Sequence, residues 1–546
     1  MPSSPHSSRE SYLSIHLERL QALKVLTHPV TVSFGVASLC LLALTGPLIS
    51  SNHDLVYHLK GSAPAIFVPV MIYVVALFLI LAPLLSMAEK PGLLRVAVWS
   101  GIVFALPWIL FVTFAGFFDA AVPAGVSTSF ALVCFLCFVV SVVWRKKLLP
   151  VFEGGQPFVA TMLGFFALCG LWIFLQLAYS GWQSRGLNSA PRLHHAQLTE
   201  GQPHQRIVWI LLDELSYQQI YEHRFPGLKL PAFDQLAAES TVFTDVTPAG
   251  KYTRYIIPSL FTGVPSDEIR VSGGGLLISM HDTATGKWDR FREQGTVFQD
   301  ALNAGYSTGV AGWYNPYCRI LPDVLDRCYW TYHQVIPAGY EADHSIGWNL
   351  LVPFRWLDLD VKHALGEERG PPSGELLDIQ THTADYRGLL AAGDALLSDP
   401  SINFLFLHIP VPHPLGFYDR TTRAFSTHPT SYIDNLALAD VYVAHVRELL
   451  EREHQWDSSV IVVMGDHSWR TSFVWAGKAG WTAEDAAASH GGKFDPRPAY
   501  LVKLANQHVA DRVDQPFAAV RTRALFDAVL QNRIRTPEEL EEWARR

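Results

Sequence analysis

The pair Asp466-His467 combines two side chains that bind divalent metals well, and it follows an apolar run from Val460 to Met464. The run is rich in β-branched residues and predicts a buried strand that ends at Gly465. Open α/β sheets place their active sites at the carboxyl ends of strands, which is where this pair would lie. Taken alone, the pair is equally well explained as an incidental polar end of a strand.

Two acids, Asp213 and Glu214, follow another continuous apolar run, residues 207–212, in the same manner. Acids at the end of a buried strand are costly to leave unpaired, and a bound cation would remove that cost. Asp213 could alternatively serve as the N-cap of a following helix. Together with Asp466, His467 and a threonine between the two strand ends, the acids favour a metal site.

Thr253 is that threonine, and it is followed by a predicted helix. The N-terminus of a helix offers free amides and the positive end of its dipole to an anion. Lys251 and Arg254 add positive charge that suits a phosphate. A threonine that is deprotonated on a divalent metal is an activated nucleophile, although a threonine at a helix start is more commonly only a cap.

Three histidines could extend the site. His408 and His413 lie at and after the end of a further apolar run, residues 402–409, and His413 is held in a stiff loop by a proline on either side. A structural role explains His408 equally well. His490, which comes before the last predicted strand, could supply a second metal ligand or a phosphate contact.

The elements that must position these residues alternate between strands and helices from residue 206 onward. Such alternation predicts an α/β fold with a mostly parallel sheet that is covered by helices on both faces. The predicted strands are residues 207–212, 241–246, 306–312, 402–409, 460–464 and 499–504. The predicted helices are residues 230–239, 297–303, 432–453 and a closing helix that begins after Thr536.

The first 182 residues hold almost all of the apolar surplus of the chain. Five runs of 19 to 23 residues carry no Asp, Glu, Lys or Arg: residues 30–49, 65–87, 96–118, 126–144 and 158–180. Each run is long enough to cross a hydrocarbon core of roughly 30 Å as a helix. Buried helices of a soluble protein are a weak alternative, because too little polar sequence lies among the runs to cover them.

The charges between the runs predict the orientation of this five-helix transmembrane domain, residues 30–182. Lys and Arg gather before the first run and on every second connector, which is the positive-inside pattern. The N-terminus is therefore predicted to be cytoplasmic, with residues 1–29 as an amphipathic lead. Residues 183–205 are predicted to be a linker, and residues 206–546 a domain outside the membrane.

The charge and the cysteines indicate which partners and which cellular compartment the protein is expected to have. The formal charge of −8 and the lack of basic clusters argue against binding to nucleic acid. Cys318 and Cys328 lie ten positions apart in the exported half and predict a disulfide in an oxidising compartment, with a zinc-binding pair as the alternative. The other four cysteines lie in the apolar runs and are expected to be inert.

The order of these features resembles the alkaline phosphatase/sulfatase superfamily, and within it the membrane-anchored phosphoethanolamine transferases and lipoteichoic acid synthases. Thr253 stands five residues before Pro258, like the nucleophile of the phosphoethanolamine transferases. Gly250-Lys251 precedes it closely, as in the lipoteichoic acid synthases. The resemblance implies an α/β/α sandwich of the alkaline phosphatase/sulfatase type, in a multi-pass protein of a bacterial inner membrane with its catalytic domain on the periplasmic or extracellular side.

The same resemblance implies roles for the site residues. His413 matches a histidine that contacts substrate or a second metal, and His490 is a looser match to a further ligand. The implied ligands of the first metal, Zn or Mn, are Asp213 or Glu214, Thr253, Asp466 and His467.

The chain departs from its relatives in ways that leave the substrate open. Sulfatases that use formylglycine need Cys or Ser two residues before Pro-Ser-Arg, and here Ile256 holds that place and Leu260 replaces the arginine. Ser259 follows Pro258, where the phosphoethanolamine transferases have cysteine. The strand-end acid is Asp-Glu instead of a single Glu.

The prediction is a metal-dependent membrane enzyme that moves a phospho-headgroup of phosphoethanolamine or phosphoglycerol type from a lipid to a cell-envelope glycan through a phosphothreonine. Its expected partners are a membrane phospholipid donor and an envelope glycan or lipid acceptor, without nucleic acid, and the protein is expected to be a monomer. One alternative is a phosphodiesterase or phosphatase that uses water as acceptor. The other is a catalytically silent, lipid-sensing regulator, against which the intact set of ligands and Thr253 argues.

Overall fold

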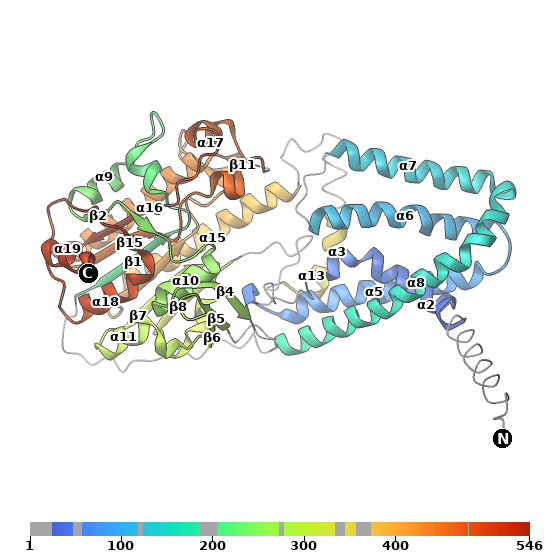
Figure 1. Ribbon diagram of the computed structural model, residues 1–546, viewed down its shortest axis with the longest axis horizontal. Helices are drawn as coiled ribbons and strands as arrows, with labels where there is room; N and C mark the ends of the chain where they lie inside the picture. Colours follow the sequence, from blue (N-terminus) through green and yellow to red (C-terminus); the bar gives the residue numbers. More distant parts are fainter. Residues whose placement is uncertain are drawn as a thin grey trace, which may run out of the picture. The chain divides into compact units, whose positions relative to one another are not determined.

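The computed structural model of the protein describes residues 24–46, 48, 57–117, 124–185, 205–271, 278–332, 344–355, 373–478 and 480–546. These residues form two compact units. One unit contains the N-terminal helices together with α13 (Ile346–Leu350), and the other contains residues 57–62 and the domain that begins at residue 205 (Figure 1). Most of the predicted amphipathic lead and of the predicted linker, residues 1–23 and 186–204, lies outside the described residues.

The helices of the N-terminal unit cover the five predicted apolar runs. Among the described residues, three are long and apolar enough to cross a membrane: Ala63–Met87, Leu93–Phe111 and Gly154–Gln183. The first run is divided at Leu41 into two short helices, and the described apolar part of the fourth, Ser129–Val143, is shorter than a span. Three spanning helices are therefore supported, and the count of five stays a prediction. The helices are α2 (Pro29–Cys40), α3 (Leu42–Thr45), α5 (Ala63–Met87), α6 (Leu93–Phe117), α7 (Ala124–Val143) and α8 (Arg145–Gln183).

Small residues allow α2 and α8 to approach each other closely. A Cβ atom on Gly35 of α2 would collide with the carbonyl oxygen of Leu163, and one on Gly170 of α8 would collide with Ser38. Glycine at such positions lets helix backbones pack together where lipid leaves no hydrophobic driving force between helices. The N-terminal unit thus has internal packing of the kind found in membrane bundles.

An eight-stranded sheet organises the other unit. Five of its strands, β12, β1, β9, β7 and β8, run parallel to one another, and β13 runs antiparallel to both β12 and β2. The α/β fold with a mostly parallel sheet is therefore confirmed. The order across the sheet is β14 (Asp511–Val513), β2 (Thr241–Phe243), β13 (Tyr500–Lys503), β12 (Val460–Gly465), β1 (Ile207–Leu212), β9 (Phe404–Ile409), β7 (Thr308–Trp313) and β8 (Arg327–Thr331).

Strand β1 shows why the sheet is covered on both faces. All six of its side chains are buried. Alternate residues pack into different core clusters, with Trp209 on one side and Ile210 on the other. The side with Trp209 is covered by α10 (Thr253–Thr262), α11 (Val297–Asn303), α18 (Thr522–Leu530) and α19 (Pro537–Arg545). The side with Ile210 is covered by α9 (Pro231–Ala238), α15 (Ser373–Leu397) and α16 (Tyr432–Arg452) (Figure 1).

Smaller elements complete the unit. The predicted strand 241–246 is divided between β2 and β3, and the predicted helix 432–453 is α16. Thr536 caps α19 with Glu539 in a capping box, as its sequence pattern predicts. The additional elements are β3 (Val246–Thr247), β4 (Ser266–Val271), β5 (Ile278–Asp282), β6 (Lys287–Arg290), β10 (Gly416–Asp419), β11 (Ala424–Thr430), β15 (Phe517–Ala518), α12 (Tyr317–Ile320) and α17 (Ala483–Ala488).

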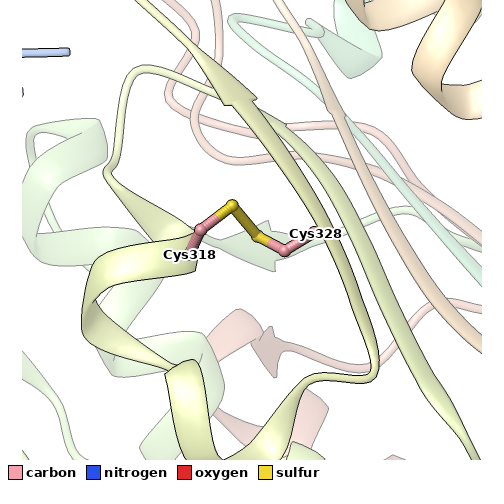
Figure 2. The surroundings of a disulfide bond; sticks show 2 residues. All are labelled: Cys318 and Cys328. Atoms are coloured by element: carbon pink, nitrogen blue, oxygen red, sulfur yellow. A yellow bond between two sulfur atoms is a disulfide. The ribbon is translucent and has the colours of Figure 1, made fainter. Parts of the chain in front are cut away.

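The predicted disulfide between Cys318 and Cys328 is confirmed. It joins α12 to β8, with a Cα–Cα distance of 5.5 Å (Figure 2). The alternative of a zinc-binding pair is therefore excluded for these two residues. The bond holds α12, which carries Tyr317, beside the edge strand β8.

Residues 57–62 belong to this unit although they precede the second apolar run in the chain. Tyr57 is buried and donates a hydrogen bond to Asn315 Oδ1 at 3.1 Å. His58 Nδ1 lies 2.8 Å from the carbonyl oxygen of Tyr314, and Arg319 donates to the carbonyl oxygen of Tyr57 at 3.0 Å. No sequence pattern predicted that this connector forms part of the α/β core.

Candidate metal centre

Three central strands end at the same level and bring the site together. Leu212 of β1 is in register with Gly465 of β12 on one side and with Ile409 of β9 on the other. Asp213 directly follows β1 and Asp466 directly follows β12, so the two residues lie side by side at the carboxyl edge of the sheet. This is the location predicted from the sequence.

Asp213, Thr253, Asp466 and His467 form a buried cluster at this edge. Thr253 Oγ1 donates a hydrogen bond to Asp466 Oδ2 at 2.7 Å and lies 3.4 Å from Asp213 Oδ2. His467 Nε2 is 3.2 Å from Asp466 Oδ2. One ligand atom of each of Asp213, Asp466 and His467 lies within 4.8 Å of the others. Thr253 is the first residue of α10, and its hydroxyl faces the carboxylates instead of capping the helix.

The donor atoms of this cluster fit a divalent cation. Among the described residues, Asp213 Oδ1 and His467 Nε2 are buried without a hydrogen-bond partner. His467 Nδ1 lies 3.0 Å from the carbonyl oxygen of Ser468, which can only accept, so Nδ1 carries a proton and Nε2 is the ring nitrogen that faces the carboxylates. Histidine ligands of metals are commonly held in this way, with one ring nitrogen donating to a carbonyl oxygen and the other directed at the metal site.

The charges on the two aspartates are unevenly stabilised. Burial, followed by the charges of Asp466 and Glu214, raises the pKa of Asp213 well above its usual value. Burial also opposes ionisation of Asp466, but His467 and the backbone N–H of Glu214, 3.0 Å from Asp466 Oδ1, outweigh it and lower the pKa of Asp466. A cation bound at the cluster would allow Asp213 to ionise as well.

Glu214 has a different environment from Asp213. Its Oε1 accepts hydrogen bonds from Arg470 Nε at 2.8 Å, from Arg470 Nη2 at 2.7 Å and from Trp475 Nε1 at 2.9 Å. The backbone N–H of Arg470 lies 3.3 Å from Oε2. Of the two acids that the sequence offered as the ligand, the geometry therefore favours Asp213, and Glu214 forms an ion pair.

His413 lies close to this ion pair. Its Nε2 is 4.0 Å from Glu214 Oε1, and its ring centroid is 5.2 Å from that of Trp313 and 5.3 Å from that of Trp475. Burial, followed by the charge of Arg470, lowers the pKa of His413 well below its usual value. Asp213, Glu214 and His413 form a second group whose spacing would suit a metal.

His408 contacts Asp213 and holds its carboxyl group in place. Its Nε2 lies 3.3 Å from Asp213 Oδ2, and its Nδ1 lies 2.6 Å from the hydroxyl of Tyr317. Burial lowers the pKa of His408 to about 4, so the ring is neutral. A neutral ring that donates from Nε2 to Asp213 and accepts at Nδ1 from Tyr317 satisfies all three groups. This is the structural alternative considered for His408.

The other predicted residues are less buried than the cluster. Lys251 is exposed, and Arg254 is partly buried and donates to the hydroxyl of Tyr255 at 2.9 Å. His490 is exposed, with its ring 5.6 Å from that of His223, and it belongs to neither of the two metal-binding groups found among the described residues.

Arg470, Trp475 and Tyr317 were not identified from the sequence. The only signal for Arg470 was its place three residues after His467. Their contacts with Glu214 and His408 join segments far apart in the chain, so residue type and spacing do not reveal them.

The α/β domain is similar in sequence to a known family and in fold to several solved structures. A family model described as "Sulfatase" matches residues 205–502. The chain is 13% identical to the phosphonate monoester hydrolase of Agrobacterium radiobacter, over 60% of this chain and 74% of that one, with a TM-score of 0.36. It is 11% identical to the lipoteichoic acid synthase LtaP from Listeria monocytogenes, over 58% and 70% of the two chains, with a TM-score of 0.34. No curated protein matches the chain.

Proposed function

The chain belongs to the sulfatase family, within the alkaline phosphatase superfamily, and we propose that it is a metal-dependent membrane enzyme that transfers a phospho-headgroup from a lipid to a cell-envelope glycan. The headgroup is of phosphoethanolamine or phosphoglycerol type and is carried on Thr253. The observation that carries the proposal is the contact of Thr253 Oγ1 with Asp466 Oδ2, 2.7 Å, inside a buried cluster that fits a divalent cation.

The position of Thr253 supports phosphoryl chemistry over formylglycine sulfatase chemistry. Ile256, which occupies the place of the modified cysteine in the sulfatase pattern, is fully buried in the hydrophobic core and cannot reach a substrate. Thr253 instead presents its hydroxyl to Asp213 and Asp466 from the first turn of α10. A threonine cannot form formylglycine, but its oxygen can attack phosphorus.

The residues of the cluster have different roles in the first step, the attack of Thr253 on phosphorus. Asp466 Oδ2 accepts the hydrogen bond of Thr253, which orients the hydroxyl, and it takes the proton as Oγ1 bonds to phosphorus. The bond from phosphorus to the lipid oxygen breaks, and that oxygen takes the proton that Asp466 accepted, so that diacylglycerol leaves as a neutral alcohol. Asp213, held by His408, and His467 complete the ligand set. A bound Zn²⁺ or Mn²⁺ would lower the pKa of the Thr253 hydroxyl and neutralise charge on the phosphoryl oxygens.

In the second step the oxygen of an acceptor hydroxyl bonds to phosphorus and the bond from phosphorus to Thr253 Oγ1 breaks. The proton of the acceptor hydroxyl passes to Oγ1, which restores Thr253. The three apolar helices of membrane-spanning length favour a lipid donor, because they would hold the catalytic domain at a membrane surface. If the acceptor is water, the protein is instead a phosphodiesterase. A silent regulator is disfavoured, since the cluster retains both its nucleophile and its unsatisfied ligand atoms.

The test is to trap the intermediate on the full-length protein in detergent. The protein is incubated with phospholipid whose headgroup phosphate is labelled, and peptides are analysed by mass spectrometry. Label is expected on Thr253, at least about a thousandfold less in Thr253→Ala, and unchanged in Thr262→Ala. Thr262 is a matched control, because it lies at the other end of α10 and its hydroxyl bonds to backbone groups, the Pro258 carbonyl oxygen and the Val264 N–H.

The fate of the label separates the possible functions. Transfer to a glycan supports the transferase, and release as a water-soluble phosphoester supports the phosphodiesterase. Absence of label from a protein that holds its metal would contradict both and leave the regulator.

A further inference from the structure

Three aromatic side chains are exposed beside the nucleophile and have no role in the steps above. Tyr252, which directly precedes Thr253, is 41% exposed, Phe473 is 52% exposed and Phe494 is 43% exposed. The ring centroid of Phe473 lies 6.5 Å from that of Tyr252 and 6.4 Å from that of Phe494. We call these three residues the aromatic patch. Single exposed apolar side chains are common on proteins, but a cluster of them marks a site of interaction.

The backbone beneath the patch holds two of its rings together. The Thr471 hydroxyl lies 3.0 Å from the carbonyl oxygen of Gly492 and 2.8 Å from that of Lys493. This contact joins the segment that carries Phe473 to the segment that carries Phe494. Apolar rings that are kept in water cost free energy, so a fixed arrangement of this kind is expected where another apolar surface covers it.

Tyr252 connects the patch to the metal centre. It is the residue before the first turn of α10, which begins with Thr253. The guanidinium carbon of Arg470, which pairs with Glu214, lies 5.7 Å from the Tyr252 ring centroid. A molecule whose phosphorus bonds to Thr253 Oγ1 would therefore have the patch next to it.

Positive charge accompanies the rings. Lys251 and Lys493 are exposed, and each directly precedes a residue of the patch. Asp495, the acid nearest to the patch in sequence, is paired with Arg497, with an N–O distance of 2.6 Å. Aromatic rings with lysines beside them suit the surface of a phospholipid layer, because rings enter the region of the glycerol and the first acyl carbons while lysines meet the phosphates.

A glycan acceptor would need different neighbours. Sugar hydroxyls both donate and accept hydrogen bonds, whereas lysine only donates and phenylalanine does neither. The rings of Phe473 and Phe494 also lie nearly parallel to each other, with an angle of 29° between them, and form one continuous apolar surface. The chemistry of the patch therefore favours a lipid over a sugar.

We propose that Tyr252, Phe473 and Phe494 bind the surface of a phospholipid layer, so that the enzyme takes its donor directly from that surface. The rings contact the glycerol and the first acyl carbons of the donor while its phosphorus lies at Thr253. The inference rests on the proposed function, because it names the source of the donor and the residues that select donors with acyl chains. The three rings bind the lipid and take no part in bond making.

The first test asks whether the patch touches lipid, and it requires no activity. p-Benzoylphenylalanine is placed at Phe473 or Phe494 of the full-length protein in nanodiscs of phosphatidylethanolamine and phosphatidylglycerol. Val441 and Val509 are the control positions, because they are exposed apolar residues of the same unit, 48% and 65% exposed. After illumination, mass spectrometry is expected to find lipid adducts mainly at the two patch positions. Equal adducts at all four positions, or none at the patch, would overturn the proposal.

The second test measures the use of donors with and without acyl chains. The rate of Thr253 labelling is compared between labelled phosphatidylethanolamine or phosphatidylglycerol in nanodiscs and the deacylated forms in solution. In Phe473→Ser with Phe494→Ser, the ratio of the two rates should fall about tenfold or more, because only the acylated donor buries apolar surface on the rings. Val441→Ser with Val509→Ser should keep the ratio of the unmodified protein.

The outcomes separate this inference from the function on which it rests. An unchanged ratio in the patch variant, or a slower transfer from Thr253 to glycan with unchanged labelling, would contradict the lipid contact, and the latter would assign the patch to the acceptor. If Thr253 never becomes labelled but lipid adducts form at the patch, the transfer reaction is wrong and the lipid-binding surface stands. If Thr253 is labelled and no adducts form, only the role of the patch is wrong.

Discussion

Asp213 and Glu214 are neighbours in the chain, are both fully buried after the end of β1, and yet have opposite surroundings. Asp213 has one oxygen without a hydrogen-bond partner among the described residues, and the charges of Asp466 and Glu214 lie close to it. Glu214 has its own arginine and a tryptophan N–H. The backbone of Glu214 has a left-handed φ of 63°, so the two residues do not continue the geometry of the strand.

The difference shows two ways to keep an acid inside a protein. Glu214 is neutralised by a partner that the fold supplies, so its environment is complete when the chain folds. Asp213 depends on a cation from solution, so its environment is completed only by binding. The first arrangement is suited to holding a group in place, and the second to capturing a reactive ion.

The largest effect on activity is expected from Asp213→Asn, which tests whether Asp213 depends on a bound cation. Loss of the carboxylate should abolish metal binding and lower phosphoryl transfer by about a thousandfold or more, since a metal supplies several kcal/mol to the transition state. With chelator present, the same variant should have a higher thermal midpoint than the unmodified protein, because a repelling buried carboxyl has been removed. Metal retained by the variant, or a lower midpoint in chelator, would contradict the assignment.

Glu214→Gln tests the ion pair of Glu214 with Arg470. It should lower the stability of the protein, whereas Asp213→Asn should raise it in the presence of chelator. It leaves the guanidinium of Arg470 buried without its counter-ion, and the free energy of unfolding should fall by about 3 kcal/mol, with or without chelator. Glu214→Leu combined with Arg470→Met should regain most of that loss, because no lone charge remains. Denaturant unfolding in the presence of chelator measures the loss in the single variant and its recovery in the double variant. Equal stability of single and double variants would mean that the pair is not coupled.

A smaller effect is expected from Tyr317→Phe, which sharpens the account of Asp213. The change removes the hydroxyl 2.6 Å from His408 Nδ1 and so loosens the ring that lies against Asp213. Metal affinity should fall by about 10- to 100-fold, the range found for partners that orient metal ligands. Competition with a metal indicator measures it, and Tyr306→Phe, a tyrosine with a smaller burial in the same unit, is the control. An unchanged affinity would show that His408 does not orient the ligand.

The sequence was sufficient for the parts of the site that are set by single strands. Residues 207–212 and 460–464 form continuous apolar runs, because a central parallel strand is buried on both faces, and β1 and β12 have these bounds to within one residue. The acids and the histidine that follow such strands must lie at one edge of the sheet. This is why Asp213, Asp466 and His467 are found together as expected.

The choice between Asp213 and Glu214 could not be made from the sequence. It depends on the backbone angle of Glu214 and on Arg470, which is 256 positions away in the chain. His490 was selected for its type and neighbours, but it precedes two glycines with left-handed φ angles and ends on an exposed turn. Such positions are fixed by loop geometry, which periodicity and residue type do not specify.

Residues 57–62 have a consequence for how this protein can be divided. Arg319 and Asn315 of the α/β unit bind Tyr57, so a fragment that begins at residue 206 lacks a segment of its own core. During synthesis this segment leaves the ribosome before β1 exists and must wait for its partners. An exchange of the catalytic domain with that of a relative would have to carry the connector with it, so the two halves of the gene are not interchangeable modules.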